Sequence, residues 1–174
     1  MNLVKQWQKG ETAAFEALFH RYREMVLRTA WSMVYEEGEA EDIVQAAFTR
    51  AYESREKFKG DEDGFRRWLY RITINLCLDT YRKRRTHLRL EQMRETGFEP
   101  STEFTQASQE ASDTMWQAMG CLDGKHRSVV VLRYLHEMSY EEIARTLGIP
   151  LGTVKSRLSV AIKIMRKKLV EEKG

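Results

Sequence analysis

The sequence predicts an all-α protein made of two small helical domains joined by a linker. Helix-forming residues dominate, and the 174 residues include only two prolines. Apolar residues recur at intervals of three and four along most of the chain. Residues 87–112 break this periodicity with Gly97, Pro100 and many Ser, Thr, Gln and Glu residues. We therefore expect a first domain over residues 1–86, a linker over 87–112 and a second domain over 113–174.

The composition excludes several classes of protein. No apolar run approaches the length of a membrane span, and the start, MNLVKQWQKGE, lacks the apolar core of a secretory signal. Cys77 and Cys121 lie in apolar helical segments without CxxC spacing. We expect buried free thiols in a reducing cytoplasm. The four histidines show no ligand spacing, so neither a metal nor another cofactor is expected.

The first two helices are predicted by their apolar spacing. Residues 11–34 predict one amphipathic helix or a pair, with apolar side chains on one face: Phe15, Leu18, Phe19, Tyr22, Val26 and Ala30. Residues 39–58 predict the next helix, and acidic residues at its start suit the helix dipole. The segment KGDEDG over residues 59–64 has the Gly and Asp residues of a loop.

The following helix, FRRWLYRITINLCLDTYRKRR over residues 65–85, combines an apolar row with a polar one. The row expected to be buried consists of Phe65, Trp68, Ile72 and Leu76. A polar ridge beside it has members spaced by four: Arg67, Arg71, Asn75 and Asp79. The helix closes with four consecutive cations, which include Arg82 and Arg84.

This combination suits single-stranded nucleic acid. Aromatic faces can stack on bases, the Asn75 amide can bond to base edges, and the cations can hold phosphates. The composition alone also fits a plainer arrangement. In that arrangement Trp68, Tyr70 and Tyr81 belong to the core and the cations solvate the end of a helix.

The second domain contains the most specific local signal, SYEEIARTLGIPLGTVKSRLSVAIKIMRKKL over residues 139–169. Ser139 and Glu142 form a capping box, which predicts a helix start. Gly148 can adopt the left-handed conformation that ends a helix, and Pro150 permits a new start. The spacing of Ala144, Gly148 and Val154 is that of a helix-turn-helix.

The second helix of this motif is predicted to bind duplex DNA. Its N-terminal turns would enter the major groove. There Arg and Lys can donate to guanine edges, while Ser and Thr suit bases or phosphates. The candidate residues are Thr153, Lys155, Ser156 and Arg157, with the positive charge continued by Lys163, Arg166, Lys167 and Lys168.

Charge is also segregated along the chain. Residues 65–89 hold eight basic and one acidic side chain, and residues 151–170 hold six basic and no acidic ones. Acidic residues dominate the two flanking blocks: ten against four over residues 36–63, and six against one over 91–113. Two basic blocks on two helices favour two contacts with a polyanion. The alternative is that solvated helix faces pair their charges across the fold.

Three motifs in this order resemble a bacterial sigma factor of the compact extracytoplasmic-function group of the sigma-70 family. They are AEDIVQAAF (40–48), FRRWLYRITINLCLDTYRKRR (65–85) and SYEEIARTLGIPLGTVKSRLSVA (139–161). The resemblance covers both domains and implies an initiation factor without catalysis of its own. Such a factor directs core RNA polymerase to promoters from the cytoplasm.

The resemblance also implies roles for the two domains. The first domain would capture the melted −10 element, with a flipped base held by residues 59–66 and Asn75. The implied −10 contacts are Arg67, Trp68, Arg71, Asn75, Arg82 and Arg84. The second domain would read the −35 duplex, and its implied contacts are Thr153, Lys155, Ser156, Arg157, Ser159 and Lys163.

Protein partners are implied in the same way. Asp42, Gln45 and Phe48 would dock on the clamp of the largest polymerase subunit, and the flap of the second-largest subunit would be a further contact. The acidic linker would run through the polymerase channel, although a plain flexible tether explains its composition equally well. An anti-sigma factor covering both domains would hold the free protein inactive.

The sequence departs from the family pattern at two places. Ala46 and Ala47 replace larger or acidic residues of many relatives, and Ser159 and Val160 replace bulkier or basic ones. The −35 sequence therefore does not transfer from a relative. Two rival functions are a dimeric regulator that shares only the helix-turn-helix and an enzyme. The enzyme is disfavoured because the sequence has no nucleophile–base set, metal cluster or phosphate-binding glycine loop.

Overall fold

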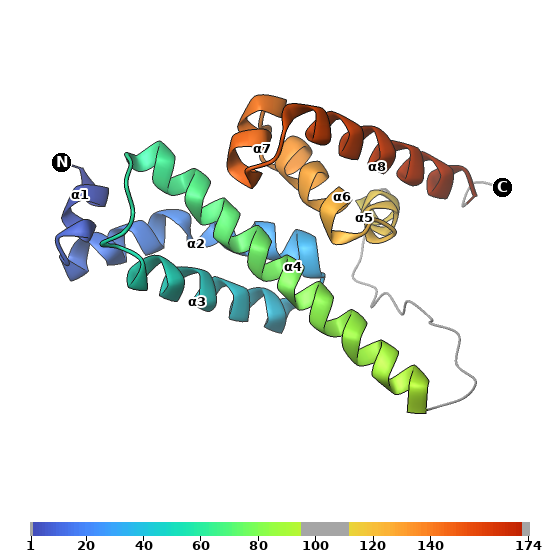
Figure 1. Ribbon diagram of the computed structural model, residues 1–174, viewed down its shortest axis with the longest axis horizontal. Coiled ribbons are helices and arrows are strands. Elements are labelled where there is room, and N and C mark those ends of the chain that lie inside the picture. The colour runs from blue at the N-terminus through green and yellow to red at the C-terminus, as the bar shows by residue number, and fades with distance from the viewer. Residues whose placement is uncertain (1, 95–111, 172–174) are drawn as a thin grey trace.

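The computed structural model describes residues 2–94 and 112–171 and is helical throughout, with no strand in those two segments. The all-α prediction is confirmed. The helices are α1 (Leu3–Gln8), α2 (Thr12–Val34), α3 (Glu37–Glu53), α4 (Glu62–Arg94), α5 (Ser112–Gly120), α6 (Gly124–Val130), a π-helical turn η1 (Val131–Leu135), α7 (Tyr140–Leu147) and α8 (Leu151–Glu171). In Figure 1, α1–α4 form one group and α5–α8 another, and the long α4 extends beyond both.

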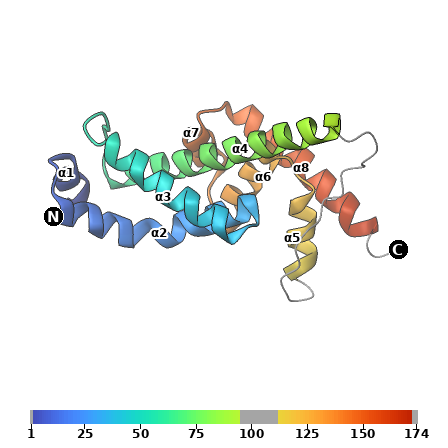
Figure 2. The ribbon, with the colours of Figure 1, turned by 90° about the horizontal axis from the view of Figure 1, so that it is seen from below.

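Helices α2, α3 and α4 form the body of the first domain and run alongside one another (Figure 2). Of the one or two helices predicted over residues 11–34, the structure has one, the single helix α2. The sequence analysis missed α1, a six-residue helix whose start is capped by Asn2. Helix α1 buries Trp7 completely, and that ring packs against Phe65 with centroids 5.1 Å apart. This short helix thus supplies the centre of an aromatic cluster.

Helix α4 is covered on two sides. Phe65 and Leu69 are fully buried in the first-domain core, whereas Ile74 and Cys77 are buried in a second apolar cluster. Of the row predicted to be buried, only Phe65 is, whereas Trp68, Ile72 and Leu76 are half-buried. The buried stripe therefore turns around the helix, because successive segments of α4 face different neighbours.

The backbone of α4 also continues past the predicted domain boundary at residue 86 as far as Arg94. The predicted linker over residues 87–112 thus begins as helix. Residues 95–111, the rest of that linker apart from Ser112, lie outside the described residues.

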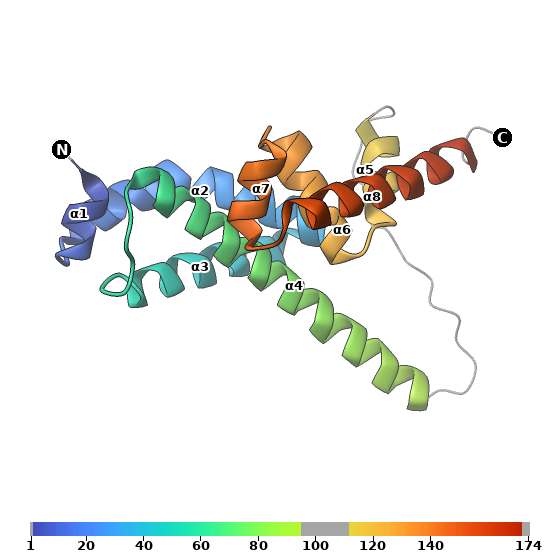
Figure 3. The ribbon, with the colours of Figure 1, turned by 45° about the horizontal axis from the view of Figure 1, so that its top comes forward.

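The second domain packs directly on the first. The apolar cluster that includes Ile74 and Cys77 also includes Val129 and Leu132 from the second domain. Figure 3 shows α7 beside the N-terminal half of α4, in agreement with their direct contact. Helices α6 and α4 approach each other closely at Gly124, where an added Cβ would lie 2.7 Å from Leu78 Cδ2 and would force that side chain to move. The two domains share one core rather than meeting at a thin interface.

Arg127 joins the two domains at the centre of this interface. Only 4% of it is exposed, and it donates hydrogen bonds to Met33 O at 2.6 Å, Gly120 O at 2.8 Å, Met119 O and Leu122 O, both at 3.1 Å, and the Tyr81 hydroxyl. Its guanidinium also lies 4.7 Å from the centre of the Tyr35 ring and 5.2 Å from that of Tyr81. Burial lowers the pKa of Arg127, although an arginine stays charged in proteins. Carbonyl dipoles and two ring faces thus solvate a buried cation in place of a carboxylate.

The two cysteines differ from each other. Cys77 is buried as predicted, and burial raises the pKa of its thiol to about 12. The prediction that Cys121 is buried was wrong, because its side chain lies exposed just after the end of α5. Among the described helices, none combines the length and apolar character that crossing a bilayer would require.

We expect Arg127→Met to lower the free energy of unfolding by about 2–4 kcal/mol, since several buried carbonyls would lose their donor. Urea denaturation followed by circular dichroism measures the loss. Lys125→Met is the matched control, because Lys125 lies two residues earlier and is exposed. An Arg127→Met midpoint equal to that of the control would contradict the role of Arg127 as the interdomain joint.

Candidate nucleic-acid interface

The helix-turn-helix of α7 and α8 forms as predicted. The Ser139 side chain accepts a hydrogen bond from Glu142 N at 3.1 Å, and Glu142 Oε2 accepts one from Ser139 N at 2.7 Å. Gly148 ends α7 with a φ of 65°, in the left-handed region that favours glycine. This local chemistry sets the angle at which α8 leaves the turn.

Helix α8 separates an apolar inner face from a polar outer face. Its buried residues are Val154, Leu158, Ala161 and Met165. The predicted −35 contacts lie around the rest of its first turns, where Thr153 and Arg157 are half-buried and the others are exposed: Lys155, Ser156, Ser159 and Lys163. No carboxylate occurs on α8 before its last residue, Glu171. Near the end of the helix, Lys167 forms an ion pair with Glu171 at 3.9 Å. The outer face of the earlier turns presents hydroxyls, and cations without an ion pair in the described part of the chain, which suits contact with phosphates.

The polar ridge on α4 also forms, and Arg71 and Asn75 are both exposed on it. Arg67 is half-buried next to Trp68. The Trp68 ring packs 5.0 Å from Phe58, centroid to centroid, and 6.0 Å from Phe65. An aromatic cluster thus holds the indole in position beside exposed cations and an amide.

The cations that close the ridge are not equivalent. Arg84 forms an ion pair with Glu39 and donates to Val34 O at 3.3 Å. Arg82 pairs with Asp79 at 2.8 Å. Both were predicted as DNA contacts, and both already have protein partners in this arrangement. Lys83, which lies between these two arginines, and Arg85, which follows them, are both exposed. Neither takes part in an ion pair within the described residues.

The predicted polymerase surface on α3 is partly exposed and partly buried. Asp42 and Gln45 are exposed on the same side of the helix. Phe48 is only 3% exposed and packs with its ring centroid 4.7 Å from that of Phe19. In this arrangement Phe48 supports α3 from within the core and offers no surface to a partner.

The two domains bring further groups together that sequence reasoning did not connect. A pocket of about 540 Å³ lies between α4 and α7, where Arg67, Trp68 and Arg71 meet Arg145. Nearby, the His136 ring from the end of η1 lies between the hydroxyls of Thr29 and Tyr70, 2.8 Å and 3.0 Å away. Thr29 and Tyr70 lie 107 and 66 positions before His136 in the chain, so no local sequence pattern could have predicted these contacts.

The hydrogen bonds determine the tautomer of His136. Thr29 donates its proton to Met25 O at 2.7 Å, so it accepts from Nε2–H of His136. Nδ1 then accepts from the Tyr70 hydroxyl. Burial, together with the positive charge of Arg28, lowers the pKa of His136 to about 4. The ring is therefore neutral at neutral pH while the two domains are packed together, an arrangement that we call closed.

Comparisons with known proteins identify the family of the chain. A family model described as Sigma-70 region 2 matches residues 18–87, and one described as Sigma-70, region 4 matches residues 118–167. The chain is 35% identical over 178 residues to the ECF RNA polymerase sigma factor SigW of Bacillus subtilis (strain 168), covering 95% of this chain and 94% of that protein. It is 32% identical over 167 residues to the ECF RNA polymerase sigma-E factor of Escherichia coli (strain K12), covering 90% and 86%.

Two solved structures share the arrangement of the whole chain. The structure of CnrH in complex with the cytosolic domain of CnrY has a TM-score of 0.70 and 28% identity, and the match covers 97% of this chain and 96% of that one. The sigma factor RpoE in complex with the anti-sigma factor NepR from Bartonella quintana has a TM-score of 0.67 and 26% identity, covering 89% and 96%.

The buried neutral His136 predicts an acid-sensitive stability. Its pKa is about 4 in the folded protein and about 6.5 when unfolded. The unfolded state therefore binds more protons between these values, and the stabilisation is complete above pH 6.5 and falls as the pH drops toward 4. We expect His136→Gln to flatten the loss of the urea midpoint between pH 7 and pH 5. The exposed His20 provides the control variant, His20→Gln. Parallel pH profiles for wild type and His136→Gln would contradict the prediction.

Proposed function

The chain belongs to the extracytoplasmic-function sigma factors of the sigma-70 family, and we propose that it brings core RNA polymerase to promoters through two separate DNA contacts. The observation that carries the proposal is the outer face of α8, where four exposed side chains stand at groove-facing positions: Lys155, Ser156, Ser159 and Lys163. This face would read the −35 duplex, joined by Thr153 and Arg157.

The ridge on α4 would bind the melted −10 strand. Asn75 and Arg71 are exposed to meet base edges and phosphates, and Trp68 offers part of its ring for stacking. A flipped base costs a few kcal/mol, so a site that holds it favours melting. We propose that Lys83 and Arg85 bind the phosphate backbone first, since Arg82 and Arg84 would have to leave Asp79 and Glu39.

The polymerase would dock on the exposed side of α3. Asp42 and Gln45 are available there, and the carboxylate suits a basic partner surface. Phe48 would contribute by holding α3 in place rather than by direct contact. The polymerase would carry out the chemistry, so the proposed role of this protein is to position the polymerase and to stabilise melted DNA, without catalysis of its own. It would work in the cytoplasm together with the polymerase.

The closed arrangement would have to open on the promoter. The −35 and −10 elements are centred about 25 base pairs apart, which is roughly 85 Å of duplex at about 3.4 Å per base pair. Here α7 contacts α4 directly. Both DNA surfaces cannot reach their elements from that arrangement, so the domains would separate during promoter binding.

An anti-sigma factor would hold the protein in the closed arrangement. One solved relative is a complex with an anti-sigma factor and has a TM-score of 0.67 to this chain. A largely apolar groove of about 510 Å³ in this chain is formed by both domains, with Leu27 and Trp31 on one side, Leu135 on the other and Glu37 at its rim. An amphipathic helix with basic residues would fit such a surface.

Transcription with purified core polymerase tests the function. Fragments of the source genome are transcribed with and without the protein, and the RNA 5′ ends are sequenced. The expected result is a set of starts that require the protein and share two upstream elements. The absence of any protein-dependent start, across the whole fragment library, would contradict the proposal.

Arg157→Ala is expected to weaken binding to those promoters by about 1–3 kcal/mol, because a donor to a base edge is lost. Holoenzyme binding to the native promoter and to variants with single changes in the −35 element measures the loss. At the position Arg157 contacts, the variant should no longer distinguish the native base. Lys125→Ala, in the same domain but away from α8, serves as the control, and an unchanged base preference in Arg157→Ala would argue against the −35 assignment.

A further inference from the structure

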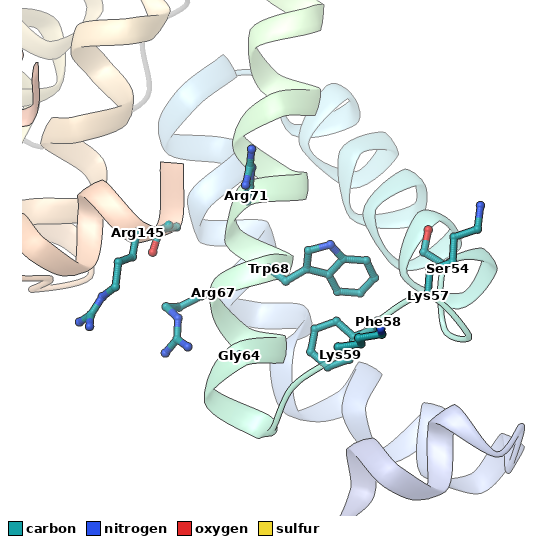
Figure 4. Close-up of a pocket in the computed structure, with 10 residues that line it drawn as sticks. Ser54, Lys57, Phe58, Lys59, Gly64, Arg67, Trp68, Arg71 and Arg145 are labelled. Atoms are coloured by element: carbon teal, nitrogen blue, oxygen red, sulfur yellow. The ribbon is translucent and has the colours of Figure 1, made fainter. Parts of the chain in front are cut away.

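Five of the ten residues that line the pocket between the two domains are cations, and all of its charged lining residues are positive (Figure 4). It has a volume of about 540 Å³, and its charged lining residues are Lys57, Lys59, Arg67, Arg71 and Arg145. No carboxylate lines it. Five cations around one opening form a site of strong positive potential.

Several acidic residues close in sequence to the pocket already have other partners. Asp61 accepts a hydrogen bond from Gly64 N at 2.8 Å, and Glu62 pairs with Arg21. Asp63 lies 3.6 Å from Arg66, and a Glu142 oxygen accepts from Ser139 N. Within the described residues, the four cations of the first domain that line the pocket have no ion pair. Arg145 lies one turn after Glu141 and Glu142, and its charge contributes to lowering the pKa of Glu142.

The second domain completes the wall of the pocket while the two domains are packed together. Arg145 and Thr146 come from α7, whereas the other lining residues come from the first domain. In Figure 4, Arg145 lies on the side of α4 from which Arg67 projects, and its side chain extends away from α4. Arg71 approaches the turn after α7 so closely that a Cβ on Gly148 would lie 3.1 Å from its Nη2. Closure therefore brings like charges together, and a bound anion would offset their repulsion.

The chemistry of the lining selects the class of anion. Arginine binds phosphate oxygens in a planar two-donor geometry, and several arginines together suit a chain of phosphates. The volume falls within the usual range of small-molecule sites, roughly 300–1,000 Å³. Trp68 and Phe58 add an aromatic edge next to the cations.

We propose that this interdomain pocket binds a small polyphosphate anion, free or attached to a nucleoside, and that the bound anion holds the two domains closed. The anion occupies Arg67 and Arg71, so it competes with single-stranded DNA for the α4 ridge. This competition rests on the proposed function, whereas the binding itself does not. Binding of a small metabolite would thus favour the closed arrangement and block the α4 ridge without any protein partner.

The binding test uses the full chain and two probes, inorganic triphosphate and adenosine triphosphate, each titrated calorimetrically without metal in about 0.1 M salt, where the Debye length is about 10 Å. One anion per chain is expected. Arg145→Ala should weaken binding about tenfold or more, because a charge-assisted contact from the second domain is lost. Lys125→Ala removes an exposed cation from the same domain outside the pocket, and its affinity should match wild type. Tighter binding of the nucleotide identifies a nucleoside-linked ligand, and equal binding identifies the phosphate chain alone.

Closure is measured separately by energy transfer between dyes on Cys121 and on a Lys5→Cys variant, since Cys121 is exposed and Cys77 is buried. Triphosphate should raise the transfer efficiency in the wild-type background and leave it unchanged with Arg145→Ala. Absent binding, binding unaffected by Arg145→Ala, or an unchanged transfer efficiency would each overturn the proposal. Protein-dependent transcript starts alongside any of these results would leave the sigma-factor function standing, because Arg145 belongs to neither DNA surface.

Discussion

The buried guanidinium of Arg127 is the interaction on which the packing of the two domains depends. It is buried among carbonyl oxygens from both domains, with Met33 on one side and Met119, Gly120 and Leu122 on the other. An isolated buried cation is expensive, so its position requires every one of these dipoles to be present. The end of α2 and the end of α5 are thereby held at one point. The shared apolar cluster adds the non-directional stabilisation around it.

Two opposing contributions act on the same interface. Burial of Ile74, Cys77, Val129 and Leu132 favours closure. The unpaired cations between α4 and α7 oppose it. A balance of this kind lets a modest ligand or partner change the population of closed molecules, because the free-energy difference is smaller than either contribution. One of the two surfaces that repel each other while the domains are packed together, the α4 ridge, is also proposed to bind DNA once they separate.

Helix α4 combines several of these roles in one continuous element. One segment buries Phe65 and Leu69 in the first domain, and a later one buries Ile74 and Cys77 against the second. Between them the exposed ridge carries Arg71 and Asn75. Because α4 is one continuous helix, a displacement caused by the second domain also moves the residues that would contact DNA. Contacts with the second domain and with DNA are therefore coupled through α4.

Features that depend on neighbours within one helical turn could be predicted from the order of the residues alone. The capping box at Ser139, the left-handed end at Gly148 and the charged outer face of α8 follow from local hydrogen bonding and spacing, and all three are present. The three motifs also predicted the sigma-factor family, which the curated relatives confirm. Only the tertiary structure decided which charges and rings find partners. Arg84 pairs with Glu39 across 45 positions and Arg127 bonds Met33 across 94. Such pairings, with the burial of Phe48 and the exposure of Cys121, depend on how whole helices pack, because a side chain's surroundings are set by distant segments that local periodicity does not encode.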